Sequence, residues 1–231
     1  LDDGCHACNV TCSATQFCGT SQCVSAVFAG ICELGRVVVV HDANSADDGD
    51  ADALAAALPS ACGRSIAIEN ASQTDPNVLD QASGRPRAAP GALLVVVGGI
   101  ASHRATRYFA ETAGLTKTTS QSVQGADGGT RIEYRRREDN RLLLNISTTT
   151  LTTRHDYFVV ELVKEPTTKA TVVLVHGLQA AGTRAAAFFV RQVLIPSRHL
   201  FGSTYYLIEW TSQSATELPT VSDRYDIHFH G

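Results

Sequence analysis

Three short runs of consecutive aliphatic residues constrain the fold most strongly. They are "RVVVV" at 36–40, "GALLVVVGG" at 91–99 and "ATVVLVHG" at 170–177. A strand with one side in solvent alternates apolar and polar residues, whereas a strand covered on both sides is apolar throughout. The three runs therefore predict central strands of a sheet that is buried on both faces.

Helical patterns follow these runs along the chain. Residues 50–63 end in a glycine, 102–114 lie between a capping Ser102 and a stopping Gly114, and 181–194 are rich in alanine. Alternation of strands and helices favours parallel strands joined by right-handed crossovers. We therefore expect an α/β fold with a mainly parallel, Rossmann-like or flavodoxin-like sheet.

Further segments complete the expected fold, including an inserted antiparallel β section. A hairpin signal, "DN", joins 130–138 to 141–149, and the alternating segment 224–231 is expected at a sheet edge. The other expected elements are strands at 65–69, 156–164 and 204–210 and a short helix at 75–83.

Composition divides the chain near residue 34. Residues 1–34 are rich in Cys, Ser and Thr and are too short to form a core, so we expect a disulfide-stapled N-terminal arm. Residues 35–231 are expected to form the α/β domain. Similar strand–turn–helix sequences occur within 35–115 and 150–231, which indicates two related halves on either side of a β-hairpin section at 116–150.

Six of the seven cysteines lie in the N-terminal arm. Cys5 and Cys8 have the spacing of zinc ligands, but a second C-x-x-C pair is missing, so we favour disulfide bonds. The odd count leaves one thiol that is either free and buried or bonded to another chain. The cysteines expected to form disulfides are Cys5, Cys8, Cys12, Cys18, Cys23, Cys32 and Cys62.

Three N-x-S/T triplets mark Asn9, Asn70 and Asn145 as glycosylation sites. One such triplet is common by chance, but three together with a cysteine cluster favour an oxidising compartment. The sequence therefore predicts a secreted glycoprotein located outside the cell or on its surface.

Charge and hydropathy exclude two classes of partner. The net charge of −4 argues against nucleic-acid binding, which requires a concentrated basic surface. No run approaches the roughly 18 consecutive apolar residues that a membrane-spanning helix requires. We therefore expect neither a nucleic-acid partner nor a transmembrane segment.

Two stretches carry a family resemblance. The first is "LLVVVGGIASHRATRYF", and the second is defined by Asp156, Tyr157, Gly177, Gly182, Thr183 and Ala186. Together they resemble the two signatures of S-layer-type α/β modules on prokaryotic, especially archaeal, cell surfaces. The resemblance covers about residues 91–210, with His103 standing where the family usually has Asn. It implies an architecture and a cell-surface setting, but no reaction.

The segment "VVLVHGLQAAG" raises the alternative of an enzyme. It resembles the His-Gly oxyanion segment of α/β-hydrolases, with His176 as the histidine. Those enzymes need a G-x-S-x-G nucleophile elbow, which the sequence lacks, and Ser203 has no second glycine after it. A histidine at a strand end with a local hydrogen bond is the simpler interpretation of His176.

An acidic segment follows the first predicted strand. In "HDANSADDGDADAL" the density of carboxylates suits Ca²⁺, although Ala46 breaks the EF-hand register. The alternative is a solvated loop in which Asp50 or Asp52 caps the next helix. The candidate calcium ligands are Asp42, Asn44, Asp47, Asp48 and Asp50.

His228 and His230 alternate within the last predicted strand and would share one face. Two imidazoles form half of a Zn²⁺ or Cu²⁺ site, and the sequence identifies no third ligand. Polar side chains facing outward from an edge strand are the simpler interpretation.

We expect a secreted structural protein, a self-assembling subunit of an extracellular filament or surface layer, rather than an enzyme. Its partner would be another copy of itself, reached through the N-terminal arm or the C-terminal strand. The alternatives are a secreted hydrolase of α/β type acting at the acidic segment or His176, and a glycan- or surface-binding module in which Trp210 offers a stacking surface. Apart from Ca²⁺, no cofactor is expected.

Overall fold

The computed structural model describes residues 16–19, 22–25, 28–32, 36–42, 47–63, 65–87, 92–168, 170–214 and 216–231. The strands are β1 (Gln16–Gly19), β2 (Gln22–Ser25), β3 (Arg36–His41), β4 (Ala67–Ser72), β5 (Ala92–Val97), β6 (Thr118–Gln124), β7 (Thr130–Arg136), β8 (Leu142–Ser147), β9 (His155–Lys164), β10 (Thr171–Gly177), β11 (Tyr205–Thr211) and β12 (Arg224–His230). The α-helices are α1 (Asp47–Cys62), α2 (Arg104–Arg107) and α3 (Ala180–Phe189), and the short helical turns are η1 (Ala29–Cys32), η2 (Tyr108–Thr112), η3 (Thr148–Thr150), η4 (Val190–Leu194) and η5 (Arg198–Leu200).

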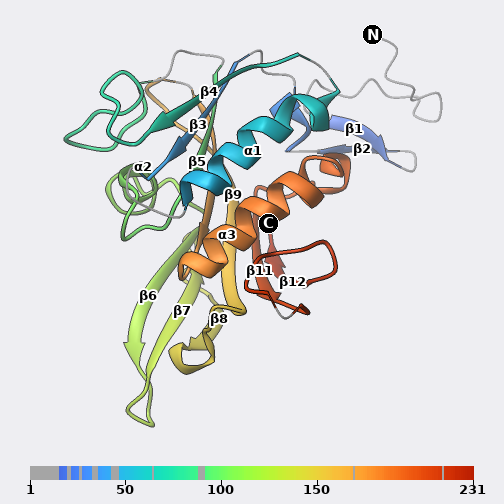
Figure 1. Ribbon diagram of the computed structural model, residues 1–231. Helices are drawn as coiled ribbons and strands as arrows, with labels where there is room; N and C mark the ends of the chain where they lie inside the picture. The colour runs from blue at the N-terminus through green and yellow to red at the C-terminus, as the bar shows by residue number, and fades with distance from the viewer. Residues whose placement is uncertain are drawn as a thin grey trace.

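A seven-stranded sheet organises the molecule (Figure 1). Its strand order is β12-β11-β9-β10-β5-β3-β4. The pairings β4–β3, β3–β5 and β5–β10 are parallel, whereas β10–β9, β9–β11 and β11–β12 are antiparallel. We call strands β4, β3, β5 and β10 the parallel half and strands β9, β11 and β12 the antiparallel half.

The expectation of a mainly parallel Rossmann-like or flavodoxin-like fold is wrong. Half of the pairings in the large sheet are antiparallel, and a separate antiparallel sheet of β6, β7 and β8 adds to the β content. Only α1 and α3 exceed eight residues among the described α-helices. The protein is therefore mostly β. Parallel pairing requires a long crossover, and the six residues between Lys164 and Thr171 are too few to provide one.

The three aliphatic runs form β3, β5 and β10 at the centre of the sheet, as predicted, and they are buried on both faces. Val37 and Val39 face a core shared with α1 and α3, while Val38 and Val40 face a second core shared with η2. Each buried aliphatic side chain contributes about 2 kcal/mol relative to solvent exposure.

Three layers result from this packing. Helices α1 and α3 run across one face of the large sheet, as Figure 1 shows. On the opposite face, α2 and η2 cover the parallel half, and the small sheet β6–β8 covers the antiparallel half through Tyr134, Leu143 and Ile146. The two halves of the large sheet thus have different partners on this second face.

The end of the cysteine-rich region joins the main core. Phe28 and Ile31 are buried there, and the Phe28 ring lies 5.9 Å from that of Tyr206. A disulfide bond connects Cys32 to Cys62 at the end of α1. Cys5, Cys8 and Cys12 lie outside the described residues, as do the side chains of Cys18 and Cys23.

Two local expectations differ from the structure. Residues 75–83 form turns rather than a helix, because Asp80 accepts hydrogen bonds from the backbone N–H groups of Ala82 and Ser83 and stabilises a turn. Strand β6 was not expected, since its sequence "TTSQSVQ" is almost entirely polar. No helix among the described residues is long and apolar enough to cross a membrane.

Candidate functional site

A crevice with a volume of about 860 Å³ opens at the carboxyl ends of the central parallel strands. Its walls include Asp42 after β3, Gly99 after β5 and His176 at the end of β10. Residues of β6 and β7 form the opposite wall. Crevices at this position in sheets with parallel strands are the usual location of ligands.

The ends of β5 and β10 beside the crevice require glycine at two points. Gly98 has φ of +144°, and a Cβ there would lie 3.0 Å from the His103 side chain. A Cβ at Gly177 would collide with the backbone of Gly182 and Thr183. Both turns therefore bring the ends of β5 and β10 close to the helices that follow them.

Asp156 positions the start of α3. Its carboxylate is buried and accepts hydrogen bonds from the backbone N–H groups of Gln179 at 3.0 Å and Gly182 at 2.6 Å. Thr183 accepts a hydrogen bond from the Gly177 N–H at 3.0 Å. Asp156, Gly177, Gly182 and Thr183, which belong to the second stretch singled out in the sequence, thus meet at this junction. Burial raises the pKa of Asp156, and the backbone donors oppose that shift.

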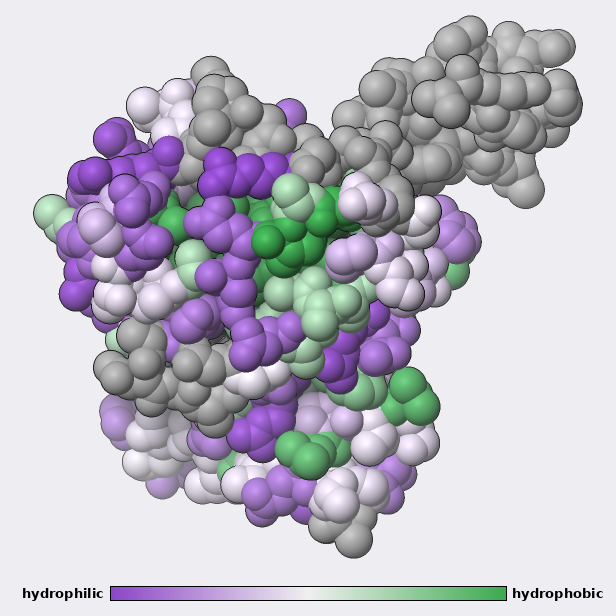
Figure 2. Space-filling model, turned by 45° about the horizontal axis from the view of Figure 1, so that its top comes forward, coloured by the Kyte–Doolittle hydropathy of each residue, from purple (hydrophilic) through white to green (hydrophobic). Residues whose placement is uncertain are grey.

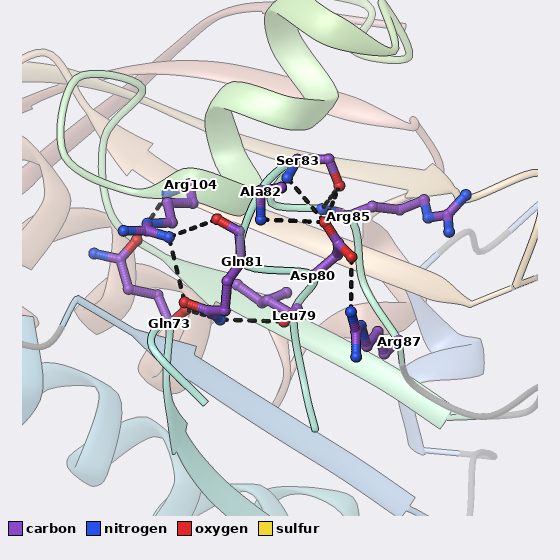
Figure 3. Close-up of polar contacts among 9 residues, drawn as sticks. All are labelled: Gln73, Leu79, Asp80, Gln81, Ala82, Ser83, Arg85, Arg87 and Arg104. Atoms are coloured by element: carbon purple, nitrogen blue, oxygen red, sulfur yellow. Dashed lines mark hydrogen bonds and ion pairs between the residues drawn. The ribbon is translucent and has the colours of Figure 1, made fainter. Parts of the chain in front are cut away.

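A polar network behind the crevice holds Asp42 in place. The Gln73 amide is buried and donates to Asp42 at 2.7 Å and to the Ser102 carbonyl at 3.2 Å. Its oxygen accepts from the Arg104 N–H at 2.8 Å. Figure 3 shows the continuation of this network, in which Arg104 also donates to Gln81. Gln73 therefore ties together the chain segments that follow β3, β4 and β5.

Two buried histidines lie at the strand ends. His176 lines the crevice, is only 5% exposed, and has no hydrogen-bond partner among the described residues. Burial lowers its pKa to about 4. His103 is fully buried and caps α2 by accepting from the Ala105 N–H, and burial lowers its pKa to about 4 as well. Both imidazoles are therefore neutral at pH 7. The expected local hydrogen bond of His176 is not present among these residues.

Tyr134 also lines the crevice, from β7. The residue is 1% exposed, and its hydroxyl has no hydrogen-bond partner in the described part of the chain. Burial, with the Asp156 carboxylate nearby, raises the pKa of Tyr134, so the hydroxyl remains a donor at all ordinary pH values. Polar groups without partners are rare in protein interiors and mark a place where another molecule can supply one.

Two arginines line the crevice without pairing to a carboxylate in the described structure. Arg107 donates to the carbonyl oxygens of Ile100 and Ala101. Arg137 donates to the carbonyl oxygens of Ala110 and Thr116. Backbone carbonyls fix both guanidinium groups and leave their positive charge available.

A buried carboxyl group attaches β6, and thus one wall of the crevice, to the large sheet. Glu161 on β9 accepts hydrogen bonds from the Lys117 N–H and the Thr118 hydroxyl. Burial raises the pKa of Glu161 to about 7.

The candidate calcium ligands are only partly described. Asn44 lies outside the described residues, as do the side chains of Asp47 and Asp48. Asp42 accepts a hydrogen bond from Gln73, and an oxygen of Asp50 lies 3.6 Å from the guanidinium of Arg184. Within the described residues no three His, Cys, Asp or Glu side chains are grouped so as to hold a metal ion.

β12 is the edge strand of the large sheet, as predicted, but its two histidines have different contacts. His228 lies 2.6 Å from one oxygen of Glu209, and His155 lies 2.7 Å from the other. The sequence signal for this cluster was limited to His228, because its partners are far away in the chain. His230 contacts the Ser203 hydroxyl at 2.9 Å.

The structure also places Trp210 and two of the three predicted glycosylation sites. Trp210 is fully buried, and its indole N–H donates to Asp223, so it cannot act as a stacking surface for a glycan. Asn70 and Asn145 are exposed, on β4 and β8, and Asn9 lies outside the described residues. Asn70 also donates to Asp52.

No protein-family model matches the sequence, and no curated protein matches it as a relative.

Proposed function

We propose that the chain is an extracellular structural protein that associates with further copies of itself through β12. The observation that carries this proposal is the open edge of that strand. β12 pairs with β11 on one side and with no other described strand on the other side. Such an edge presents unpaired backbone N–H and C=O groups and is a template for another strand.

Most of the exposed large hydrophobic side chains belong to the C-terminal part of the sequence that contains β12. Of the five large hydrophobic residues that are exposed in the described chain, four lie after residue 199. Ile227 belongs to β12, and Leu218 and Val221 belong to the segment that leads into it. On the face shown in Figure 2, hydrophobic residues form separate patches within a mainly hydrophilic surface. This distribution favours a local contact involving the C-terminal segment.

A second copy of the chain is the partner that best fits the strand. If two β12 strands pair antiparallel along residues 224–227, Arg224 of each copy stands opposite Ile227 of the other, and Tyr225 stands opposite Asp226. An irregularity opposite Leu207 and Ile208 interrupts the pairing of β12 with β11. Because β-bulges protect edges from pairing, we expect addition along the regular segment 224–227.

A two-fold contact closes after two copies, so a filament or layer needs a second interface. We propose that the cysteine-rich arm supplies it. Extracellular location, glycosylation and the S-layer-type resemblance belong to the same proposal, and the exposure of Asn70 and Asn145 supports it because glycans require accessible asparagines.

The test is sedimentation velocity of the full chain under oxidising conditions over a wide range of concentrations. We expect Ile227→Lys to weaken association, since it places a charge in the contact. Leu142→Lys is the matched control, because Leu142 is 42% exposed and Ile227 is 44% exposed. The proposal fails if the wild-type chain remains monomeric, and β12 is not the contact if both variants weaken association equally.

A further inference from the structure

We propose that the crevice binds a sugar unit that carries a single carboxylate group, a uronic acid. This site is separate from β12, and the inference does not depend on self-association. It rests on three observations: the size and position of the crevice, the arginines on its walls, and the buried polar groups that lack partners.

The dimensions suit a small polar ligand. A volume of about 860 Å³ falls within the roughly 300–1,000 Å³ that is typical of small-molecule sites. Thr119, Ser120, Gln121 and Ser122 of β6 form part of the wall. The wall is thus rich in hydroxyl and amide groups, which bind the hydroxyls of a sugar.

The carboxylate subsite is built from Arg107 and Arg137. Both guanidinium groups are held by backbone carbonyls and have no carboxylate partner within the described chain. Ala180, in the first turn of α3, also lines the crevice, but the N–H groups of Gln179 and Gly182 already donate to the Asp156 carboxylate. The subsite therefore relies on the guanidinium groups, which bind carboxylates.

The balance of charges limits the ligand to one negative group. Asp42 and Glu111 also line the crevice, so they offset the two arginines in the overall charge. A polyanion would meet repulsion from these carboxylates. A singly charged ligand with neutral hydroxyls fits better than a phosphate-rich one.

Tyr134 and His176 form the part of the site that would bind sugar hydroxyls. The Tyr134 hydroxyl is a buried donor without an acceptor in the described part of the chain, and the neutral His176 ring can both donate and accept. Leaving such buried groups without a partner costs free energy. A ligand hydroxyl in the crevice can accept a hydrogen bond from Tyr134 and exchange one with His176.

The experiment is isothermal titration calorimetry of the full chain with glucuronate, glucose and inorganic phosphate. We expect glucuronate to bind, glucose to bind at least about tenfold more weakly, and phosphate to bind no better than glucose. A glucuronate-containing oligosaccharide distinguishes a free sugar from a glycan chain, because it binds more tightly only if the crevice recognises a chain. Equal binding of phosphate and glucuronate would overturn the sugar assignment, and no binding of glucuronate would overturn the site.

Tyr134→Phe separates a ligand role from a structural one. Since the hydroxyl has no partner among the described residues, its removal is expected to leave the thermal midpoint unchanged or higher while weakening glucuronate binding about tenfold. Tyr205→Phe is the matched control, because Tyr205 is a buried tyrosine in the same core cluster that does not line the crevice. Arg107→Gln is expected to weaken glucuronate binding about tenfold and to leave the affinity for glucose unchanged. If Tyr134→Phe lowers stability and leaves affinity unchanged, the proposal is wrong.

Discussion

The parallel and antiparallel halves of the large sheet use their polar residues in different ways. In the parallel half, the inner strands β3, β5 and β10 are buried along most of their length, and polar groups such as His176 and Asp42 occur at their carboxyl ends. In the antiparallel half, Glu209 lies on β11 and contacts His155 of β9 and His228 of β12. The difference indicates that the parallel half builds a recessed site, whereas the antiparallel half builds an outer surface.

The variant with the largest expected effect disrupts the contact between Asp156 and the start of α3, on which the recessed site depends. Gly182→Ala places a Cβ 2.6 Å from the Asp156 carboxylate, so it displaces the group that holds the start of α3. We expect a loss of about 3 kcal/mol or more in the free energy of unfolding, measured by denaturant titration.

Gly49→Ala is the matched control for that variant. Gly49 lies in α1, and a Cβ there would meet no atom of the described residues within 4 Å. Alanine is expected to stabilise this helix by up to about 1 kcal/mol. Equal destabilisation by the two variants would contradict the assigned role of Asp156.

Acid should act on the parallel half through its buried histidines. The pKa values of His103 and His176 fall from 6.5 to about 4 on folding, so the unfolded chain binds protons that the folded chain does not. Stability is therefore lost as pH falls below 6.5, by about 2 kcal/mol per histidine between pH 7 and 5. His176→Gln should reduce this slope in unfolding measurements. An unchanged slope would show that His176 is not neutral in the folded state.

The smallest effect concerns the antiparallel half and has a different pH dependence. The carboxylate of Glu209 contributes to a raised pKa of His155, and the two histidines contribute to a lowered pKa of Glu209. The His155 contribution is present below 6.5 and is lost as pH rises through its raised folded pKa, and the Glu209 contribution is present above 4.5 and is lost as pH falls through its lowered folded pKa.

Glu209→Gln should therefore destabilise the protein most between about pH 4.5 and 6.5, by about 1 kcal/mol or less because the cluster is partly exposed. Glu133→Gln is a suitable control, since Glu133 pairs with Arg135 rather than with a histidine. An effect of Glu209→Gln that grows above pH 7 would contradict the ion-pair interpretation.

Sequence patterns identified the central strands because a strand buried on both faces is an unbroken run of aliphatic residues, which is visible locally. They did not identify how β9, β11 and β12 pair, because pairing direction depends on connections and contacts between distant residues. The six residues between Lys164 and Thr171 were the one local signal for an antiparallel pair. Strand β6 was missed because both its faces are polar or half-buried.

The candidate site was only partly visible in the sequence. His176 and Asp42 were singled out, and both line the crevice. Tyr134, Arg107 and Arg137 were not, since an isolated tyrosine or arginine has no distinctive spacing. Their role arises from the placement of the small sheet over the strand ends, which no short motif encodes. Gly177, Gly182 and Asp156 were recognised as a pattern, and the capping of α3 supplies its physical reason.

Hydrogen–deuterium exchange measured at low and high protein concentration tests the central claim most directly. If β12 is the contact between copies, backbone protection in residues 216–231 rises with concentration, while protection around the crevice, at 98–107 and 177–183, stays constant. Concentration-independent exchange in 216–231, or protection that rises first around the crevice, would contradict the division between an outer association surface and a recessed binding site.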